Sequence, residues 1–134
     1  MDTINSNLML KNMAFTNISV KRSFDLPNNL DIMGSFDVRY EEIDDNEIIV
    51  VLKYLAKSKK EEISIDIELK GNFVTRDIED KKVSKYLLHV NSLAIMFPYL
   101  RSQISIVTTQ PGFVPIQIPI INAVALAREA GFEE

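Results

Sequence analysis

The chain has 134 residues, a formal net charge of −4, 46% hydrophobic residues and 25% charged residues. This length suffices for an apolar core, and we expect residues 1–134 to form a single domain. The acidic balance argues against a nucleic-acid-binding surface, and the absence of cysteine excludes disulfides, thiol nucleophiles and cysteine-ligated metals. The N-terminus lacks a basic start followed by an apolar core, and prolines and Arg101 interrupt the most apolar region. We therefore expect a cytoplasmic protein with no secretory signal and no membrane span.

Four strands are predicted in the N-terminal half, where apolar and polar residues alternate. They lie at about residues 13–24, 35–43, 47–56 and 62–73. The last strand is the clearest, because every second residue from Ile63 to Leu69 is apolar and those between are polar. The third strand is apolar on both sides, which predicts that both of its faces are covered. Short polar links at 44–46 and 57–60 make neighbouring strands antiparallel, so we expect a four-stranded antiparallel meander.

Three helices are predicted in the C-terminal half. The first spans about residues 82–90, and the second begins near Ile95, with Pro98 in its first turn because proline is tolerated there. The third lies between Asn122, which is expected to cap its N-terminus, and Gly131, which is expected just past its end. The chain therefore has the element order of an α+β protein.

The second predicted helix is apolar on nearly all sides. A stripe with 3-4-3 spacing is widened by three further apolar residues: Phe97, Leu100, Ile104 and Val107, with Met96, Tyr99 and Ile106. Such a helix is expected to be buried on two sides. One sheet and a few helices cannot easily cover both this helix and a two-sided strand. We therefore expect a symmetric homo-oligomer, either a dimer or a dimer of dimers.

No arrangement of residues in the sequence indicates catalysis. His89 is the only histidine and stands among apolar residues, so an interior or interface histidine is favoured over a catalytic one. The carboxylates cluster at predicted strand ends, where solvation and protection of sheet edges explain them. The four glycines are scattered and metal-ligand spacing is absent, so we expect no phosphate loop, no metal and no cofactor. We expect a protein that is not an enzyme, and a small α+β enzyme remains an alternative.

The segment from Gln110 to Ile120, QPGFVPIQIPI, is an uncharged apolar loop. Its three prolines exclude a helix or a central strand, yet Val114, Ile116, Ile118 and Ile120 alternate as in a half-buried strand. Loops are usually polar because they run over the surface. Either this loop packs on the core of its own chain, or it forms the wall of a groove for an apolar segment of another chain. The pattern alone favours the first interpretation.

The run from Ile95 to Arg101, IMFPYLR, resembles the signature helix I-L-F-P-Y-A-R of the SecB export chaperones. After that helix the family has a glycine-containing break, a phenylalanine, an extended apolar loop and an asparagine, and Gly112, Phe113, residues 114–121 and Asn122 stand in that order. Two upstream motifs are also similar to the family. They are SFDLPN at residues 23–28, near the family's S-F-E-A-P-N, and GNF at residues 71–73, near its G-x-F.

The resemblance implies an α+β fold in which a four-stranded antiparallel sheet is followed by a long helix, an extended apolar loop and a C-terminal helix. Family members are dimers of dimers, and they hold unfolded polypeptides without ATP in long apolar grooves. The loop between the last two helices helps to line those grooves. The client-binding residues implied for this chain are Phe97, Tyr99, Phe113, Val114, Ile116, Ile118 and Ile120.

The resemblance also implies a contact with the translocation motor SecA, to which the family hands its cargo through acidic residues on the sheet. The candidate contacts are Asp25 and Asp66. The family motif D-I-S-F-E reads KRSFD here, so Lys21 reverses the charge of the first acid. This departure argues against docking on SecA. Two hypotheses stay open: a holdase, with or without an export role, and a SecB-fold binding module dedicated to a single partner such as an antitoxin.

Overall fold

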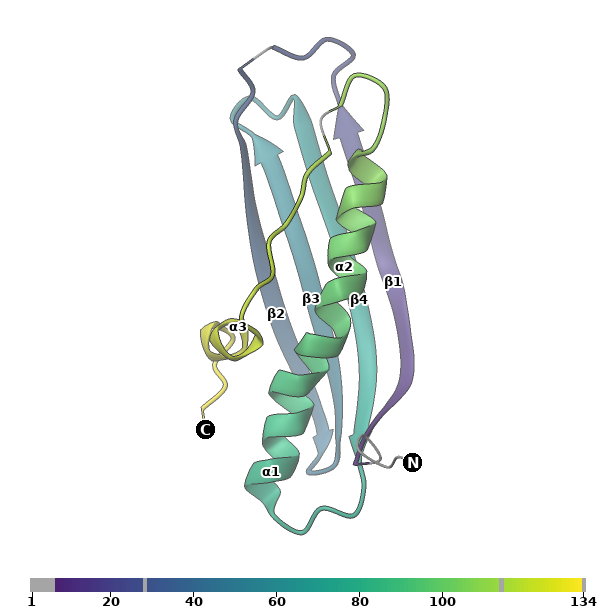
Figure 1. The fold of residues 1–134 in the computed structure, drawn as a ribbon, viewed down its shortest axis with the longest axis vertical. Coiled ribbons are helices and arrows are strands. Elements are labelled where there is room, and N and C mark those ends of the chain that lie inside the picture. Colours follow the sequence, from purple (N-terminus) through teal and green to yellow (C-terminus); the bar gives the residue numbers. More distant parts are fainter. Residues whose placement is uncertain (1–6, 28, 114, 134) are drawn as a thin grey trace.

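The structure is a computed structural model that describes residues 7–27, 29–113 and 115–133. A four-stranded antiparallel sheet carries a long helix on one of its faces (Figure 1). The strands are β1 (Leu8–Arg22), β2 (Ile32–Asp44), β3 (Glu47–Ser58) and β4 (Ile63–Thr75). The helices are α1 (Lys81–Tyr86), the π-turn η1 (Leu87–Asn91), α2 (Ser92–Thr108) and α3 (Ala123–Glu129). The predicted α+β class is therefore confirmed.

The order of strands in the sheet is β1-β4-β3-β2. Strands β2, β3 and β4 form the predicted meander, but the prediction was wrong for β1, which pairs with β4 and not with β2. The connection at residues 23–31 crosses the end of the sheet (Figure 1). Nine extended residues reach about 30 Å, whereas three strand spacings amount to about 14 Å. This link is long enough to place β1 on the far edge, so the rule for short links does not apply to it.

The core lies between the sheet and the long helix. In β4 the alternating residues Ile63, Ile65, Ile67 and Leu69 are buried on the helix side, as predicted. In β3 the helix-side residues are buried as well, but the other face has no helix over it. Leu55 on that face is 39% exposed, whereas Val51, whose register partners are Arg39 and Lys70, is 2% exposed. The prediction that both faces of β3 are covered is thus not met within one chain.

The helical region from Lys81 to Thr108 is continuous, and the predicted break between a first and a second helix was wrong. In the π-turn the N–H of Ser92 bonds to Leu87 five residues back, and the hydroxyl of Ser92 donates to the carbonyl of Leu88. Pro98 lies inside α2 and not in a first turn. A proline there removes a helical hydrogen bond. Burial of the helix against the sheet outweighs this cost, since four apolar side chains of α2 are 0% exposed: Leu93, Met96, Leu100 and Ile104.

The last helix forms as its capping signals predict. The side chain of Asn122 accepts hydrogen bonds from the backbone N–H groups of Val124 and Ala125. Gly131 follows the end of α3 with φ +99°, in the left-handed region that glycine adopts without strain. Helix α3 follows the extended loop (Figure 1). Its residues Ala123 and Leu126 line one side of a cavity against α2.

Candidate functional site

The apolar loop begins with a tight turn at the end of α2. The N–H of Phe113 donates to the carbonyl of Gln110 at 3.1 Å, and Gly112 has φ +73°, which favours glycine. The N–H of Ile116 then donates to the hydroxyl of Thr108 at 2.9 Å. From there the chain runs without helix or strand towards α3 (Figure 1). The prolines of this loop explain why it stays extended, because each lacks the donor that a helix or a strand ladder needs.

Most apolar side chains of the loop pack on its own core, and Ile120 near its end does not. Phe113 is buried, Ile116 and Ile118 are half-buried against the core, and Ile120 is 84% exposed. The predicted alternation therefore ends near Pro119, where Ile121 turns inward instead. The start of the loop therefore packs on the core of its own chain, as the first interpretation predicts, and the groove interpretation stays a prediction for the part around Ile120.

A cavity of about 350 Å³ lies where α2, the end of the loop and α3 meet. Residues from all three elements line it, and they are apolar except for one arginine: Phe97, Pro98 and Arg101 from α2, Ile120 and Ile121 from the loop, and Leu126 from α3. Its size is at the lower end of the range for ligand pockets in proteins. The cavity can therefore accept large apolar side chains, with Ile120 exposed beside them.

The structure brings together only some of the residues expected to bind a client. Phe97 and Ile120 meet at the cavity, where the ring of Phe97 packs 5.3 Å from that of Phe36 on β2. Tyr99 is 55% exposed and lies away from Phe97, because two residues along a helix turn by about 200°. Phe113 lies at the far end of the loop. Val114 lies outside the described residues.

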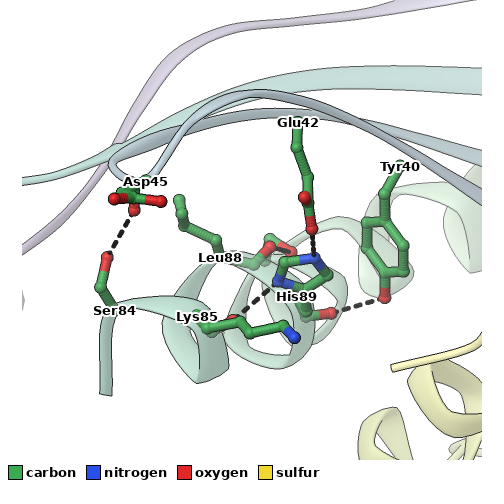
Figure 2. A network of polar contacts seen from close by, with 8 residues as sticks. Tyr40, Glu42, Asp45, Ser84, Lys85, Leu88 and His89 are labelled. Carbon is green, nitrogen blue, oxygen red and sulfur yellow. Dashed lines mark hydrogen bonds and ion pairs between the residues drawn. The ribbon is translucent and has the colours of Figure 1, made fainter. Parts of the chain in front are cut away.

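His89 in the π-turn contacts Tyr40 and Glu42 of β2 (Figure 2). It is 5% exposed, its Nε2 lies 2.8 Å from Oε1 of Glu42, and its Nδ1 lies 2.8 Å from the carbonyl of Lys85. The hydroxyl of Tyr40 donates to the carbonyl of His89 at 2.7 Å, and the ring of Phe132 stacks on the imidazole at 5.3 Å. Burial raises the pKa of Tyr40, which keeps the phenol protonated as a donor. The interpretation of His89 as an interior histidine is confirmed.

Comparison with known proteins decides the family. The profile of the SecB family, described as preprotein translocase subunit SecB, matches residues 4–131. The chain belongs to the SecB family. The resemblance on the signature helix, the apolar loop and the strand-end motifs is therefore confirmed over nearly the whole chain.

Three relatives of this SecB-family chain are informative. An uncharacterised protein of Methanocaldococcus jannaschii, MJ0357, is 28% identical over 125 residues, which cover 90% of this chain and 79% of that protein. The protein-export protein SecB of Jannaschia sp. is 26% identical over 128 residues, or 90% of this chain and 74% of that protein. The protein-export protein SecB of Burkholderia vietnamiensis is 36% identical over 93 residues, or 67% of this chain and 58% of that protein.

A solved structure shares the fold of this SecB-family chain. It is the Mycobacterium tuberculosis Rv1957 SecB-like chaperone in complex with a ChAD peptide from the Rv1956 HigA1 antitoxin. The TM-score is 0.66 at 13% sequence identity, and the match covers 88% of this chain and 90% of that one. The fold expected from the resemblance is thereby confirmed.

The face of the sheet opposite the helix carries charges of both signs. Glu68, Lys53 and Asp37 lie side by side on β4, β3 and β2. The Nζ of Lys53 also lies 3.8 Å from Oδ1 of Asp66. Asp66 is half-buried in the outer face of β4, whereas Asp25 is exposed in the link after β1. The two candidate SecA contacts are therefore on separate parts of the chain, and the acidic groups of the sheet are interspersed with lysines.

Sequence reasoning missed the role of Arg22. The sequence shows it only as a break in the alternation of β1, but its guanidinium donates to the carbonyl of Gly112, 90 residues away, at 2.9 Å. It also lies 5.9 Å over the ring of Phe113. No local pattern indicates this contact, since the partners are brought together only when β1 pairs with β4 and the loop follows α2.

Membrane spans and metal clusters are both absent from the described ranges. No helix in this part of the chain is long and apolar enough to cross a membrane. Within the same ranges, histidine, aspartate and glutamate side chains do not gather in groups of three that could hold a metal ion.

Proposed function

We propose that this SecB-family chain is an ATP-independent holdase that binds apolar segments of unfolded polypeptides. The observation that carries the proposal is the cavity between α2, the loop and α3, with Phe97 in its wall and Ile120 84% exposed beside it. An apolar lining next to an exposed isoleucine gives an unfolded chain a place to remove its own apolar side chains from water. The proposal includes no catalytic step, cofactor or metal.

The driving force is the burial of apolar surface, worth about 25 cal/mol per Å². The loop is held extended by its prolines, so a client does not have to order it on binding. Contacts of this kind are weak and tolerate many client sequences. We include Phe97, Ile116, Ile118 and Ile120 in the client-binding wall, and we assign to Phe113 the task of anchoring the start of the loop.

The outer side of α2 supports association of several copies of this chain. Three large apolar side chains on it are exposed: Ile95 by 39%, Tyr99 by 55% and Ile106 by 62%. We propose that a second copy covers them, in a dimer or a dimer of dimers, as the two-sided pattern of the helix predicts. Several grooves in one oligomer then bind a long client with avidity.

We propose that the holdase acts in the cytoplasm and without SecA. Lys21 and the mixed charges of the outer sheet face support the absence of SecA docking, because the family contacts SecA through acidic residues and lysines offset the acids here. The alternative is a binding module for a single client. A specific observation favours it: the SecB-like chaperone with this fold was solved with a peptide from an antitoxin.

The test is suppression of aggregation. A chemically unfolded test protein is diluted into buffer with one oligomer of this chain per client, and light scattering is followed over time. We expect delayed aggregation of the unfolded form and no binding to the native form of the same protein. Unchanged aggregation for several unrelated clients would contradict the holdase. Capture of one folded partner, with no affinity for unfolded chains, would support the dedicated module instead.

A further inference from the structure

Arg22, the last residue of β1, connects two segments that are far apart in the sequence. Its Nη1 donates to the carbonyl of Gly112 at the start of the apolar loop, and its Nη2 donates to the carbonyl of Phe24, each at 2.9 Å. Its Nε donates to the carbonyl of Ser23, also at 2.9 Å. The planar guanidinium therefore specifies the positions of three peptide groups at once.

On the loop side, Arg22 holds the first turn in two ways. The bond to Gly112 fixes the carbonyl of a residue with φ +73°, and the guanidinium lies 5.9 Å over the ring of the next residue, Phe113. A cation over an aromatic face adds a favourable interaction. The same turn is closed by the N–H of Phe113, which donates to the carbonyl of Gln110 at 3.1 Å.

On the sheet side, Arg22 is tied to a rigid element. It pairs with Ile63 of β4, and the N–H of the next residue, Ser23, donates to the carbonyl of Glu62 at 2.7 Å. The loop is thus fastened to the end of the sheet and not only to α2, from which it emerges. A second hydrogen bond also fixes the start of the loop, because the N–H of Ile116 donates to the hydroxyl of Thr108.

We propose that Arg22 is a positioning residue for the client-binding groove. It fixes the first turn of the apolar loop against the end of the sheet and so sets the path on which Ile116 to Ile121 reach the cavity. This inference rests on the proposed function. A loop that is already in place costs a client no ordering entropy, so loss of the clamp weakens binding without removing any client contact. The export-chaperone motif D-I-S-F-E has an isoleucine at this position, which cannot donate these bonds.

The test compares Arg22→Lys and Arg22→Ala with Lys21→Ala, the matched control on the neighbouring residue, which lies on the opposite face of the sheet. Hydrogen exchange of the Phe113 and Ile116 amides is measured by NMR, with the Leu52 amide in the core as reference. Dissociation of a labelled unfolded client is measured in parallel. We expect about tenfold faster exchange at Phe113 in both Arg22 variants, the effect of one lost charged hydrogen bond. Client dissociation should also be about tenfold faster, and the Lys21 variant should match the wild type.

The outcomes separate this inference from the proposed function. If the wild type binds no client, the proposed function fails, and the exchange data still decide whether Arg22 holds the loop. If the wild type binds and the Arg22 variants loosen the loop without faster dissociation, the positioning role is overturned and the holdase stands. Equal acceleration at Leu52 would show a general loss of stability and would also overturn the inference. If Arg22→Ala does not fold, Arg22→Lys gives the measurement, because it keeps the aliphatic stem.

Discussion

Truncation of Ile120 to alanine tests the groove most directly. Ile120 is 84% exposed in the free chain, so nearly all of its side chain is available for a client to cover. The substitution removes three carbon atoms, each worth about 0.8 kcal/mol when buried, or about 2.4 kcal/mol in all. If the client covers between half and all of these atoms, its affinity falls about 7- to 50-fold, since 1.4 kcal/mol is a factor of ten.

The assay is fluorescence anisotropy of a labelled peptide with one short apolar segment, because a long client would conceal the loss through avidity. The matched control is Ile43→Ala, which removes the same atoms from a side chain that is 53% exposed at the end of β2. Both variants should unfold in urea within about 0.5 kcal/mol of the wild type, since neither side chain is buried. The reasoning is refuted if Ile120→Ala binds the peptide within twofold of the wild type, or if Ile43→Ala weakens binding as much.

Three further predictions concern stability and assembly. Gly71→Ala would place a Cβ 2.7 Å from Cε1 of Phe73 and 3.1 Å from Sδ of Met96. This substitution should lower the free energy of unfolding in urea by about 1–3 kcal/mol. An unchanged midpoint of urea unfolding would contradict this and show that the side chains around Gly71 accommodate the added methyl group. Hydrogen bonds from its own backbone N–H and from the hydroxyl of Ser58 lower the pKa of Glu62 from 4.5, so its carboxylate stabilises the fold at neutral pH. The stability difference between wild type and Glu62→Gln should therefore shrink as the pH falls through 4.5 and below, and an equal difference at pH 3 and pH 7 would contradict this. Ile106→Glu, on the outer side of α2, should shift the chain to a smaller oligomer in analytical ultracentrifugation. An unchanged mass of the oligomer would show that this surface is not part of the interface.

Several features followed from the sequence by itself because their causes act over a few residues. The alternation from Ile63 to Leu69 predicted β4, since side chains in a strand point to opposite faces in turn. Asn122 and Gly131 predicted the ends of α3, because a cap satisfies backbone groups within one turn. The prolines predicted that the segment before α3 is extended, since each lacks a backbone donor. The family was likewise readable from the signature helix and the loop behind it.

Other features depended on the tertiary structure, because competing local patterns were of similar strength and long-range packing decided between them. The position of β1 beside β4 required a link that crosses the sheet, and the continuous helix required the buried side chains of α2 to outweigh the cost of Pro98. Packing also decided that Ile118 turns towards the core and Ile120 towards solvent, although both are isoleucines in the same alternation. The bond from Arg22 to Gly112 spans 90 positions and exists only once both elements are in place. Periodicity and capping act between neighbours in sequence, whereas a groove is made of surfaces that meet only after folding.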